Sequence, residues 1–256
     1  MHTKFAVIGD SFAEGVGDEW PDGSPRGWAD LVAGGLAAAS DRTCTYANLA
    51  IRGKLLAPIL DDQLPAALRL GPDLLSISGG NNDILRPRVS IAANARRITA
   101  GLDAAVRTGA DVLFVTVADM TRHLPLGRLI RRRGDEYADH IRSWADRPNV
   151  TVVDNWTDAG FHDLALWAPD RLHLNTLGHR RVAANVLTAL GVPLPTWDGA
   201  VRLAERTSTI EHLRVHVLPW VGRRLTGRSS GDGRTPKSAT LGPVREEGTG
   251  LEARPR

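Results

Sequence analysis

The chain of 256 residues has one cysteine, Cys44, and lacks a long apolar run. A single cysteine excludes an intrachain disulfide and a metal site built from several thiolates. A helix that spans a bilayer needs about 20 consecutive apolar residues, and no segment approaches that length. The first residues, Met1 to Lys4, continue directly into a strand-like segment and not into the apolar core of a signal peptide. We therefore expect a cytoplasmic location and no transmembrane segment.

An excess of positive charge is also missing from most of the chain. The formal net charge is +3, but residues 1–222 carry 24 basic and 25 acidic side chains. A nucleic-acid-binding domain needs a positive face to neutralise phosphates, so we expect no nucleic-acid partner.

The excess of positive charge lies in residues 223–256, which carry eight basic and four acidic side chains and no aromatic residue. Such a composition cannot bury enough apolar surface to offset the entropy of ordering. We expect a disordered basic tail that is either only solvated or makes weak contact with an anionic surface.

Apolar segments of strand and helix length alternate along the rest of the chain. The patterns predict strands at residues 4–9, 43–49, 73–78, 111–117 and 150–154. They predict helices at residues 28–39, 55–70, 90–108, 135–145 and 176–190, with Pro58 and Pro65 as breaks in the second. This alternation favours right-handed crossovers and a mostly parallel sheet covered on both faces. We therefore predict an α/β fold, a three-layer α/β/α sandwich around a five-stranded sheet.

Three parts follow from these patterns. Residues 1–195 contain the alternating strands and helices given above and would form the domain that carries the function. Residues 196–222 keep aromatic and aliphatic side chains at spacings that permit a packed helix, so we expect a helical extension there. Residues 223–256 form the tail, and we expect that its deletion leaves the function unchanged.

Ser11 follows the first predicted strand on a turn that begins at Gly9. Ligands bind outside the carboxyl ends of the strands in sheets of this kind, so the position suits chemistry. A serine there can be a nucleophile or simply the N-cap of the next helix. The surrounding residues miss the nucleophile elbow G-x-S-x-G because Ala13 replaces the second glycine.

Asn81 and Asn82 follow the third predicted strand, after two glycines. Such residues form sharp turns, which can explain the segment without any function. Alternatively, one carboxamide points an N–H donor at a developing oxyanion. Gly53, in the loop after the second strand, could bring a backbone N–H to the same place because it has no side chain.

Asp170 and His173 lie on a predicted turn before the last helix. Their three-residue spacing lets a carboxylate orient an imidazole and stabilise its protonated form, although an isolated pair of this kind is also a common surface feature. The remaining histidines lack a comparable position after a strand, and we interpret them as solvent-exposed or structural. They are His2, His123, His140, His162, His179, His212 and His216.

These motifs together resemble the blocks of the SGNH, or GDSL, hydrolase family. The matching segments are Gly9-Asp10-Ser11, Gly53, Gly80-Asn81-Asn82-Asp83 and Asp170-x-x-His173, in the family's order. The resemblance covers roughly residues 4–190. Phe12 stands where the family's namesake motif has leucine, and we expect its ring to pack beneath the turn.

The resemblance implies a flavodoxin-like sheet and a serine-dependent hydrolase of small-molecule esters that needs neither metal nor cofactor. It implies that Ser11 is the nucleophile, His173 the general base and then acid, and Asp170 its orienting partner. The oxyanion hole would combine the backbone N–H groups of Ser11 and Gly53 with the Asn82 side chain. Two alternatives stay open, an acyltransferase with the same triad and a catalytically silent binding module on this fold. The silent module predicts loss of Ser11, Asn82 or His173, and all three are present.

Two further segments bear on the substrate. Residues 119–134 carry five arginines among aliphatic residues, and they form either a flexible cover that favours amphipathic or anionic acyl groups or a solvated loop. Trp20 and Trp28 flank a loop rich in glycine and proline after Ser11, and they line an acyl pocket or simply pack in the core.

Overall fold

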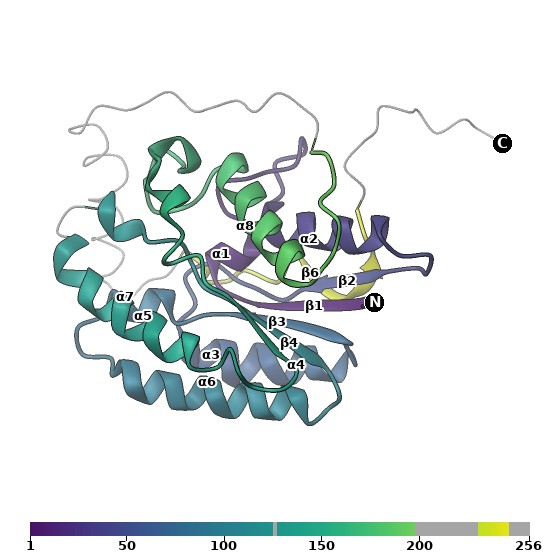
Figure 1. The fold of residues 1–256 in the computed structure, drawn as a ribbon, viewed down its shortest axis with the longest axis horizontal. Helices are drawn as coiled ribbons and strands as arrows, with labels where there is room; N and C mark the ends of the chain where they lie inside the picture. The colour runs from purple at the N-terminus through teal and green to yellow at the C-terminus, as the bar shows by residue number, and fades with distance from the viewer. Residues whose placement is uncertain (125–126, 198–229, 246–256) are drawn as a thin grey trace.

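A six-stranded sheet forms the centre of the molecule (Figure 1). The structure, a computed structural model, describes residues 1–124, 127–197 and 230–245. The strands are β1 (Lys4–Gly9), β2 (Thr45–Asn48), β3 (Leu74–Ser78), β4 (Asp111–Val115), β5 (Val150–Val153) and β6 (Ser238–Pro243). Their order across the sheet is β5-β4-β3-β1-β2-β6.

The first five strands pair in parallel, with Val7 opposite both Asn48 of β2 and Ser76 of β3. Their order is the flavodoxin-like one, in which the chain reverses direction across the sheet at β1 and β3. Ser11 follows β1, so it lies at this switch point. The five strands predicted from the sequence are confirmed within a few residues at each end.

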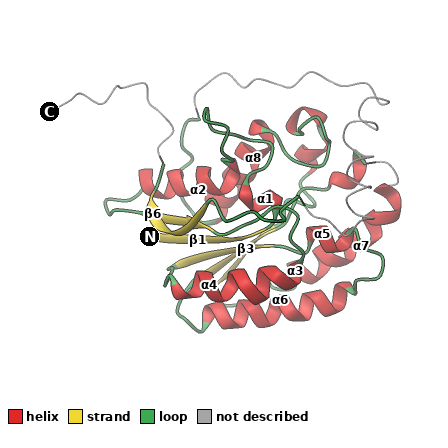
Figure 2. Ribbon diagram, turned by 180° about the vertical axis from the view of Figure 1, so that it is seen from behind, coloured by secondary structure: helices red, strands yellow, loops and turns green. Residues whose placement is uncertain are grey.

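Helices cover both faces of the sheet. They are α1 (Ser11–Glu14), α2 (Gly27–Ala38), α3 (Leu56–Pro58), α4 (Leu64–Arg69), α5 (Asn81–Ile84), α6 (Ile91–Val106), α7 (Gly127–Arg142) and α8 (Thr176–Ala189). Single turns lie at η1 (Ile59–Gln63), η2 (Met120–Arg122), η3 (Ala159–His162) and η4 (Leu164–Leu166). Figure 2 shows α1, α2 and α8 on one face and α3 to α7 on the other, so the predicted three-layer α/β/α sandwich is confirmed.

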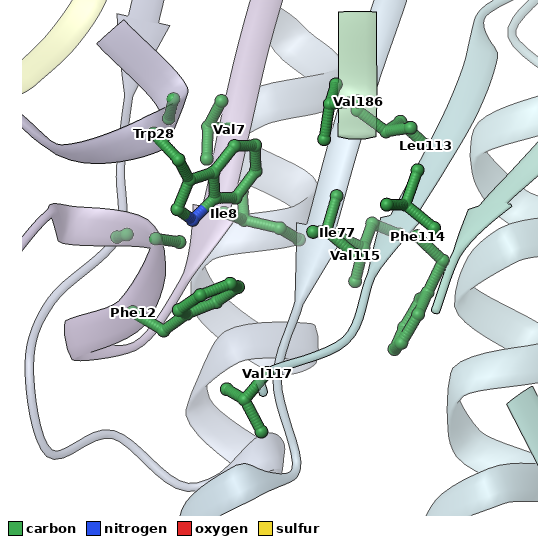
Figure 3. Close-up of a cluster of buried hydrophobic side chains, with 14 of the residues drawn as sticks. Val7, Ile8, Phe12, Trp28, Ile77, Leu113, Phe114, Val115, Val117 and Val186 are labelled. Atoms are coloured by element: carbon green, nitrogen blue, oxygen red, sulfur yellow. The ribbon is translucent and has the colours of Figure 1, made fainter. Parts of the chain in front are cut away.

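The core fills the space between these layers. Buried strand residues such as Ile8 and Ile77 meet Trp28 of α2 and Val186 of α8 on one face (Figure 3). Burial of both faces explains why β3 is an uninterrupted buried segment and not an alternating one.

Two predicted helices differ from the structure. The helix expected over 55–70 is divided into α3, the π-helical turn η1 and α4. The helix expected at 135–145 begins eight residues earlier, at Gly127, so much of the predicted connection over 119–134 is helical. Gly134 looks like a helix breaker, but it lies inside α7, where a Cβ would meet the Trp156 ring at 2.2 Å. A helix interior tolerates glycine when an aromatic ring packs against its bare backbone.

The prediction of a disordered tail over residues 223–256 is wrong for residues 230–245. They contain β6, a sixth strand that pairs antiparallel with β2 and therefore also corrects the five-stranded sheet. Leu241 and Val244 pack against the core. The composition argument fails here because the segment needs no core of its own: it uses the free hydrogen-bonding edge of β2.

The proposed helical extension at 196–222 lies outside the described residues, apart from its first two. One of these, Trp197, packs against the core. Within the described part of the chain, no helix has both the length and the apolar character that crossing a bilayer requires. The cytoplasmic location stays a prediction.

Candidate active site

Ser11 is the first residue of α1, directly beyond β1. The backbone at Gly9 passes so close to β3 that a Cβ there would lie 2.3 Å from the Ser78 carbonyl oxygen, so only glycine fits. The N-cap is Asp10, whose side chain accepts a hydrogen bond from the Phe12 backbone N–H. The alternative that Ser11 itself serves as the N-cap is therefore wrong, and its hydroxyl remains available for another partner.

That partner is His173. The Ser11 Oγ lies 3.0 Å from His173 Nε2, and His173 Nδ1 lies 2.5 Å from the Asp170 Oδ2. A carboxylate only accepts hydrogen bonds, so Nδ1 carries the proton and Nε2 is left to accept the proton of the Ser11 hydroxyl. The structure thus brings together three residues that the sequence separates by 162 positions at the widest.

Asp170 is held in place by the turn that it begins. Its Oδ1 accepts from the backbone N–H groups of Leu172 and His173, at 3.0 and 2.9 Å. Burial alone would raise the pKa of Asp170, but the charge and hydrogen bonds of His173 outweigh burial and hold that pKa well below its usual range. Asp170 is therefore a carboxylate at any pH at which the protein functions.

The pKa of His173 is shifted in the opposite direction. Burial disfavours the imidazolium, but the Asp170 carboxylate and, with a smaller effect, Asp10 outweigh burial and raise the pKa of His173 above 6.5. The side chain is still 22% exposed. His173 is consequently a stronger base than a free histidine and remains within reach of a substrate.

Gly53 lies in the loop after β2, and Asn82 lies in α5, after β3. Gly53 has a φ of +75°, a left-handed conformation that glycine adopts without strain. The Asn82 Nδ2 donates to the Lys54 carbonyl oxygen at 3.0 Å, so it ties its own loop to the residue after Gly53. Its other contact, to the Asp10 Oδ2, is long at 3.4 Å. Turn formation alone therefore does not explain Asn82, because its carboxamide also connects α5 to the loop after β2.

Asp10 is a site residue to which the motif comparison gave no role. The residue is 1% exposed, and its Oδ2 lies 3.4 Å from the Nδ2 atoms of both Asn81 and Asn82. Burial raises the pKa of Asp10 to about 7, against a smaller opposing effect of the Phe12 N–H. A second titratable group therefore lies beside His173 and changes charge near neutral pH.

Glu14 and Arg52 are two further residues that sequence reasoning missed. The Glu14 carboxylate accepts from the backbone N–H of Arg52 at 2.6 Å and from its guanidinium at 2.6 to 3.1 Å. Arg52 directly precedes Gly53, so this bidentate pair fixes the Gly53 loop against the end of α1. No local pattern indicates the pair, because the partners are 38 residues apart.

The predicted acyl-pocket tryptophans have other surroundings. Trp28 is fully buried and packs against Phe12 with ring centroids 5.6 Å apart, which favours the packing interpretation and confirms that Phe12 lies beneath the turn. Trp20 is covered by the guanidinium of Arg245 at 4.3 Å from its ring centroid. His179 is buried between backbone groups, as the structural interpretation expects.

The arginine-rich segment borders a cavity of about 790 Å³ where α7 begins. Asp119 is buried and lies 3.4 Å from Arg131 and 3.6 Å from Arg122, two residues of the cavity lining. Arg133 instead donates to the backbone carbonyl oxygens of Ile84, the last residue of α5, and of Arg86 and Val89 beyond it. The cavity is lined by Thr121, Arg122, Leu124, Gly127, Arg128, Leu129 and Arg131. Whether this segment covers a substrate stays a prediction.

Among residues 1–124, 127–197 and 230–245, no cluster of three or more His, Cys, Asp or Glu side chains could hold a metal ion. The groups gathered at this edge of the sheet are instead a hydroxyl, an imidazole, a carboxylate and an amide. This set is suited to nucleophilic attack on a carbonyl and to proton transfer.

The fold and the site define a class of protein: an α/β/α sandwich with a serine, a histidine and an aspartate hydrogen-bonded in series at the carboxyl edge of a parallel sheet. Comparison with family models then identifies the family. Residues 7–181 match the model of the GDSL-like lipase/acylhydrolase family. The chain belongs to this family and is an enzyme that hydrolyses ester bonds.

Solved structures agree with this fold. A lipase, Lip_vut3, from a goat rumen metagenome is 14% identical, with a TM-score of 0.63 over 75% of this chain and 100% of that one. A catalytic mutant of the acetylxylan esterase Axe2 from Geobacillus stearothermophilus is 20% identical, with a TM-score of 0.64 over 75% and 95%. TesA is 23% identical, with a TM-score of 0.60 over 73% and 98%. A search of curated proteins gave no match.

Proposed function

We propose that the protein is a serine-dependent carboxylic-ester hydrolase in which Ser11 is the nucleophile, His173 the general base and acid, and Asp170 the residue that orients His173. The observation that carries this proposal is the series of two hydrogen bonds, 3.0 Å from Ser11 to His173 and 2.5 Å from His173 to Asp170. Such a series activates a serine hydroxyl irrespective of fold.

In the first half of the reaction the Ser11 Oγ attacks the ester carbonyl carbon while its proton passes to His173 Nε2. Negative charge develops on the carbonyl oxygen, and the N–H groups of Ser11, Gly53 and the Asn82 side chain stabilise it. The oxyanion replaces the long contact of Asn82 with Asp10. Collapse of the intermediate breaks the ester bond, and the leaving alkoxide takes the proton from His173, so an acyl-enzyme remains.

In the second half a water molecule attacks the acyl carbon and gives its proton to His173 Nε2. Collapse of this second tetrahedral intermediate releases the carboxylic acid and returns the proton to Ser11. Asp170 stays ionised throughout and stabilises the imidazolium that forms in each half. The proposal uses no metal ion or organic cofactor.

The first test is the Ser11→Ala variant with p-nitrophenyl acetate. We expect turnover to fall by about 10⁴-fold or more, as it does when other serine hydrolases lose a triad member. Folding should be unchanged, because loss of one hydroxyl creates no sizeable cavity. An organophosphonate probe should label Ser11 in the wild-type protein. A variant that keeps a tenth of the wild-type activity would refute the assignment.

The Asn82→Ala variant tests the oxyanion hole in the same assay. Its turnover should fall by about 10²- to 10³-fold with little change in KM, since the amide acts on the developing charge. Asn81→Ala is the matched control, and a larger loss there would assign the donor to the other amide.

The substrate can be narrowed by comparing p-nitrophenyl esters of increasing chain length with acetylated sugars and lysophospholipids. Acyl transfer would use the same residues, and it would appear as a new ester product when an alcohol is added. Hydrolysis is our proposal, and it predicts free acid as the main product in both conditions.

A further inference from the structure

Residues 230–245 lie against the loop that carries Gly53, although they are beyond residues 7–181, which match the family model. In β6, Ser238 lies opposite Asn48, the last residue of β2 (Figure 1). The residues just before Ser238 therefore reach the carboxyl end of β2. From that end the chain continues into the loop with Gly53.

Lys237, directly before β6, inserts its ammonium group beside α1. Its Nζ lies 2.7 Å from the carbonyl oxygens of Glu14 and Arg26, and 2.5 Å from the Asp30 Oδ2. Only 15% of the Lys237 side chain is exposed. An ammonium group has three N–H donors, so these acceptors satisfy all of them. Lys237 thus joins the end of the nucleophile helix to the start of α2.

Gly231 makes the second contact of this segment. A Cβ at this position would lie 2.0 Å from the carbonyl oxygen of Arg52 and 3.0 Å from the Ile51 Cγ2. The backbone of residue 231 therefore lies directly on the loop of residues 51–53. Gly231 has no left-handed φ, so its requirement for glycine comes from this close approach and not from backbone strain.

Both contacts converge on Arg52, whose carbonyl group belongs to the peptide bond with Gly53. Gly231 lies against the Arg52 carbonyl oxygen, and Lys237 holds the backbone of Glu14, whose carboxylate accepts from the Arg52 N–H. Rotation of the peptide between Arg52 and Gly53 would turn the Gly53 N–H away from the site. The Gly231 backbone lies against the carbonyl oxygen of that peptide, and Glu14 of α1 holds the preceding peptide through the Arg52 N–H.

We propose that the residues just before β6 are a working part of the active site, in which Gly231 and Lys237 are positioning residues that aim the Gly53 N–H at the oxyanion. The inference rests on the proposed function, since it concerns the placement of one of its donors. Positioning matters because a displacement of about 1 Å in an active site can reduce the rate by about 10²-fold.

The first test compares Gly231→Ala with Gly242→Ala in the full-length chain. Both glycines lie in the C-terminal segment, but a Cβ on Gly242 meets nothing within 4 Å. We expect Gly231→Ala to lower kcat for p-nitrophenyl acetate about tenfold or more while KM stays within about twofold, because the donor acts on the transition state. Gly242→Ala should match the wild type. Circular dichroism at the assay temperature gives the folded fraction.

The second test serves even if Gly231→Ala does not fold. The double variant Lys237→Met/Asp30→Asn removes both charges of the buried pair together, so that neither is left unpaired. We expect the same loss of kcat with unchanged KM. A double variant that is folded and has wild-type kcat would overturn the role of Lys237.

The inference as a whole is overturned if Gly231→Ala is folded and keeps a kcat within twofold of Gly242→Ala, or if both variants lose kcat equally. The wild type and Ser11→Ala are assayed in parallel, so that failure of the positioning role can be distinguished from failure of the proposed function. If the wild type hydrolyses no ester, or Ser11→Ala remains active, the proposed function fails. If these two behave as expected, only the positioning role fails.

Discussion

Asp10, Asp170 and His173 form a group of interacting charges around the Ser11 hydroxyl. Asp170 stays ionised and raises the pKa of His173, while Asp10, with a pKa of about 7, adds a second negative charge only as the pH rises. Because Asp10 and His173 interact, the two groups titrate as a pair and not as independent residues. The pH dependence of the rate should therefore report Asp10 as well as the base.

The Asp10→Asn variant tests this coupling. Neutral His173 is the active base, so the rate should fall as the pH drops through its pKa, which in the wild type is raised above 6.5. Removing the Asp10 charge should lower the pKa of His173, and the midpoint of the kcat/KM profile should move to lower pH. The maximal rate should also fall, because an amide at position 10 points a donor at Asn82. A midpoint that stays in place or moves to higher pH contradicts the coupling.

His179 lies on the other side of the nucleophile turn and has a structural role. Its Nδ1 accepts from the Trp28 backbone N–H and its Nε2 lies 3.2 Å from the Val16 carbonyl oxygen, so the neutral ring fits both. Burial lowers the pKa of His179 from 6.5 to about 4. The unfolded chain thus binds this proton first, and the stability that neutral His179 contributes is lost as the pH falls from 6.5 toward 4.

We expect this loss to appear in a comparison with His179→Gln. The difference in unfolding free energy between wild type and variant should be largest near pH 7 and should shrink by about 3 kcal/mol toward pH 4. The difference is the informative quantity, because Asp10 titrates in both proteins and stabilises the fold as the pH falls. Urea unfolding at a series of pH values measures it. A constant difference would mean that His179 does not titrate in this range.

Among the elements, α2 and α8 pack closely against each other on the face of the sheet that also carries α1 and Ser11 (Figure 2). Gly35 of α2 is buried, and a Cβ there would lie 2.7 Å from the Leu187 Cδ1 of α8. Gly34, its neighbour in the same helix, has nothing within 4 Å of the equivalent point. The contact with α8 therefore requires glycine at position 35 but not at position 34.

Alanine substitutions at the two positions should consequently differ in sign. Gly34→Ala should raise the unfolding free energy by up to about 1 kcal/mol, because alanine loses less backbone entropy in a helix. Gly35→Ala should be less stable than Gly34→Ala by about 1 to 3 kcal/mol, because the added methyl group overpacks the helix contact. Thermal or urea unfolding of the two variants measures the difference. Equal stabilisation by both would show that α8 shifts without penalty.

At the scale of the whole molecule, the C-terminal residues return to the sheet edge next to β2. Lys237 lies 207 residues from its carboxylate partner Asp30, and β6 covers an edge that would otherwise present unpaired backbone groups. Our expectation that deletion of the tail leaves the function unchanged rested on its disorder, and that disorder is wrong for the part that contains β6.

Deletion of residues 230–256 should lower stability by about 3 kcal/mol or more, since it leaves the Asp30 charge buried without its cation. We expect a fall of several degrees in Tm by calorimetry. Arg245→Ala is the control, because that arginine pairs with an exposed carboxylate, Asp22, and its loss should change Tm little. If the truncated chain has the same Tm as the wild type, β6 contributes nothing to the stability of the fold.

The sequence by itself determined the five parallel strands, the layered α/β class and the three residues now seen hydrogen-bonded in series. Each of these has a local signal. The strands are apolar runs of strand length, Ser11 directly follows a strand at the edge where a parallel sheet gathers its loops, and Asp170 and His173 lie on a turn before a helix. Ser11, Asp170 and His173 could be found in this way because they follow turns that the sequence marks with glycine, proline and aspartate.

The tertiary structure alone decided the contacts that have no local signal. Glu14 with Arg52 and Lys237 with Asp30 are distant pairs, and their charged side chains look like ordinary solvated residues in the sequence. Residues 230–245 have too few apolar side chains to fold independently, yet they order because β2 offers a free edge and the α1–α2 region offers a group of acceptors for one ammonium. Whether such a segment orders depends on the surface that it meets, and only the folded chain supplies that surface.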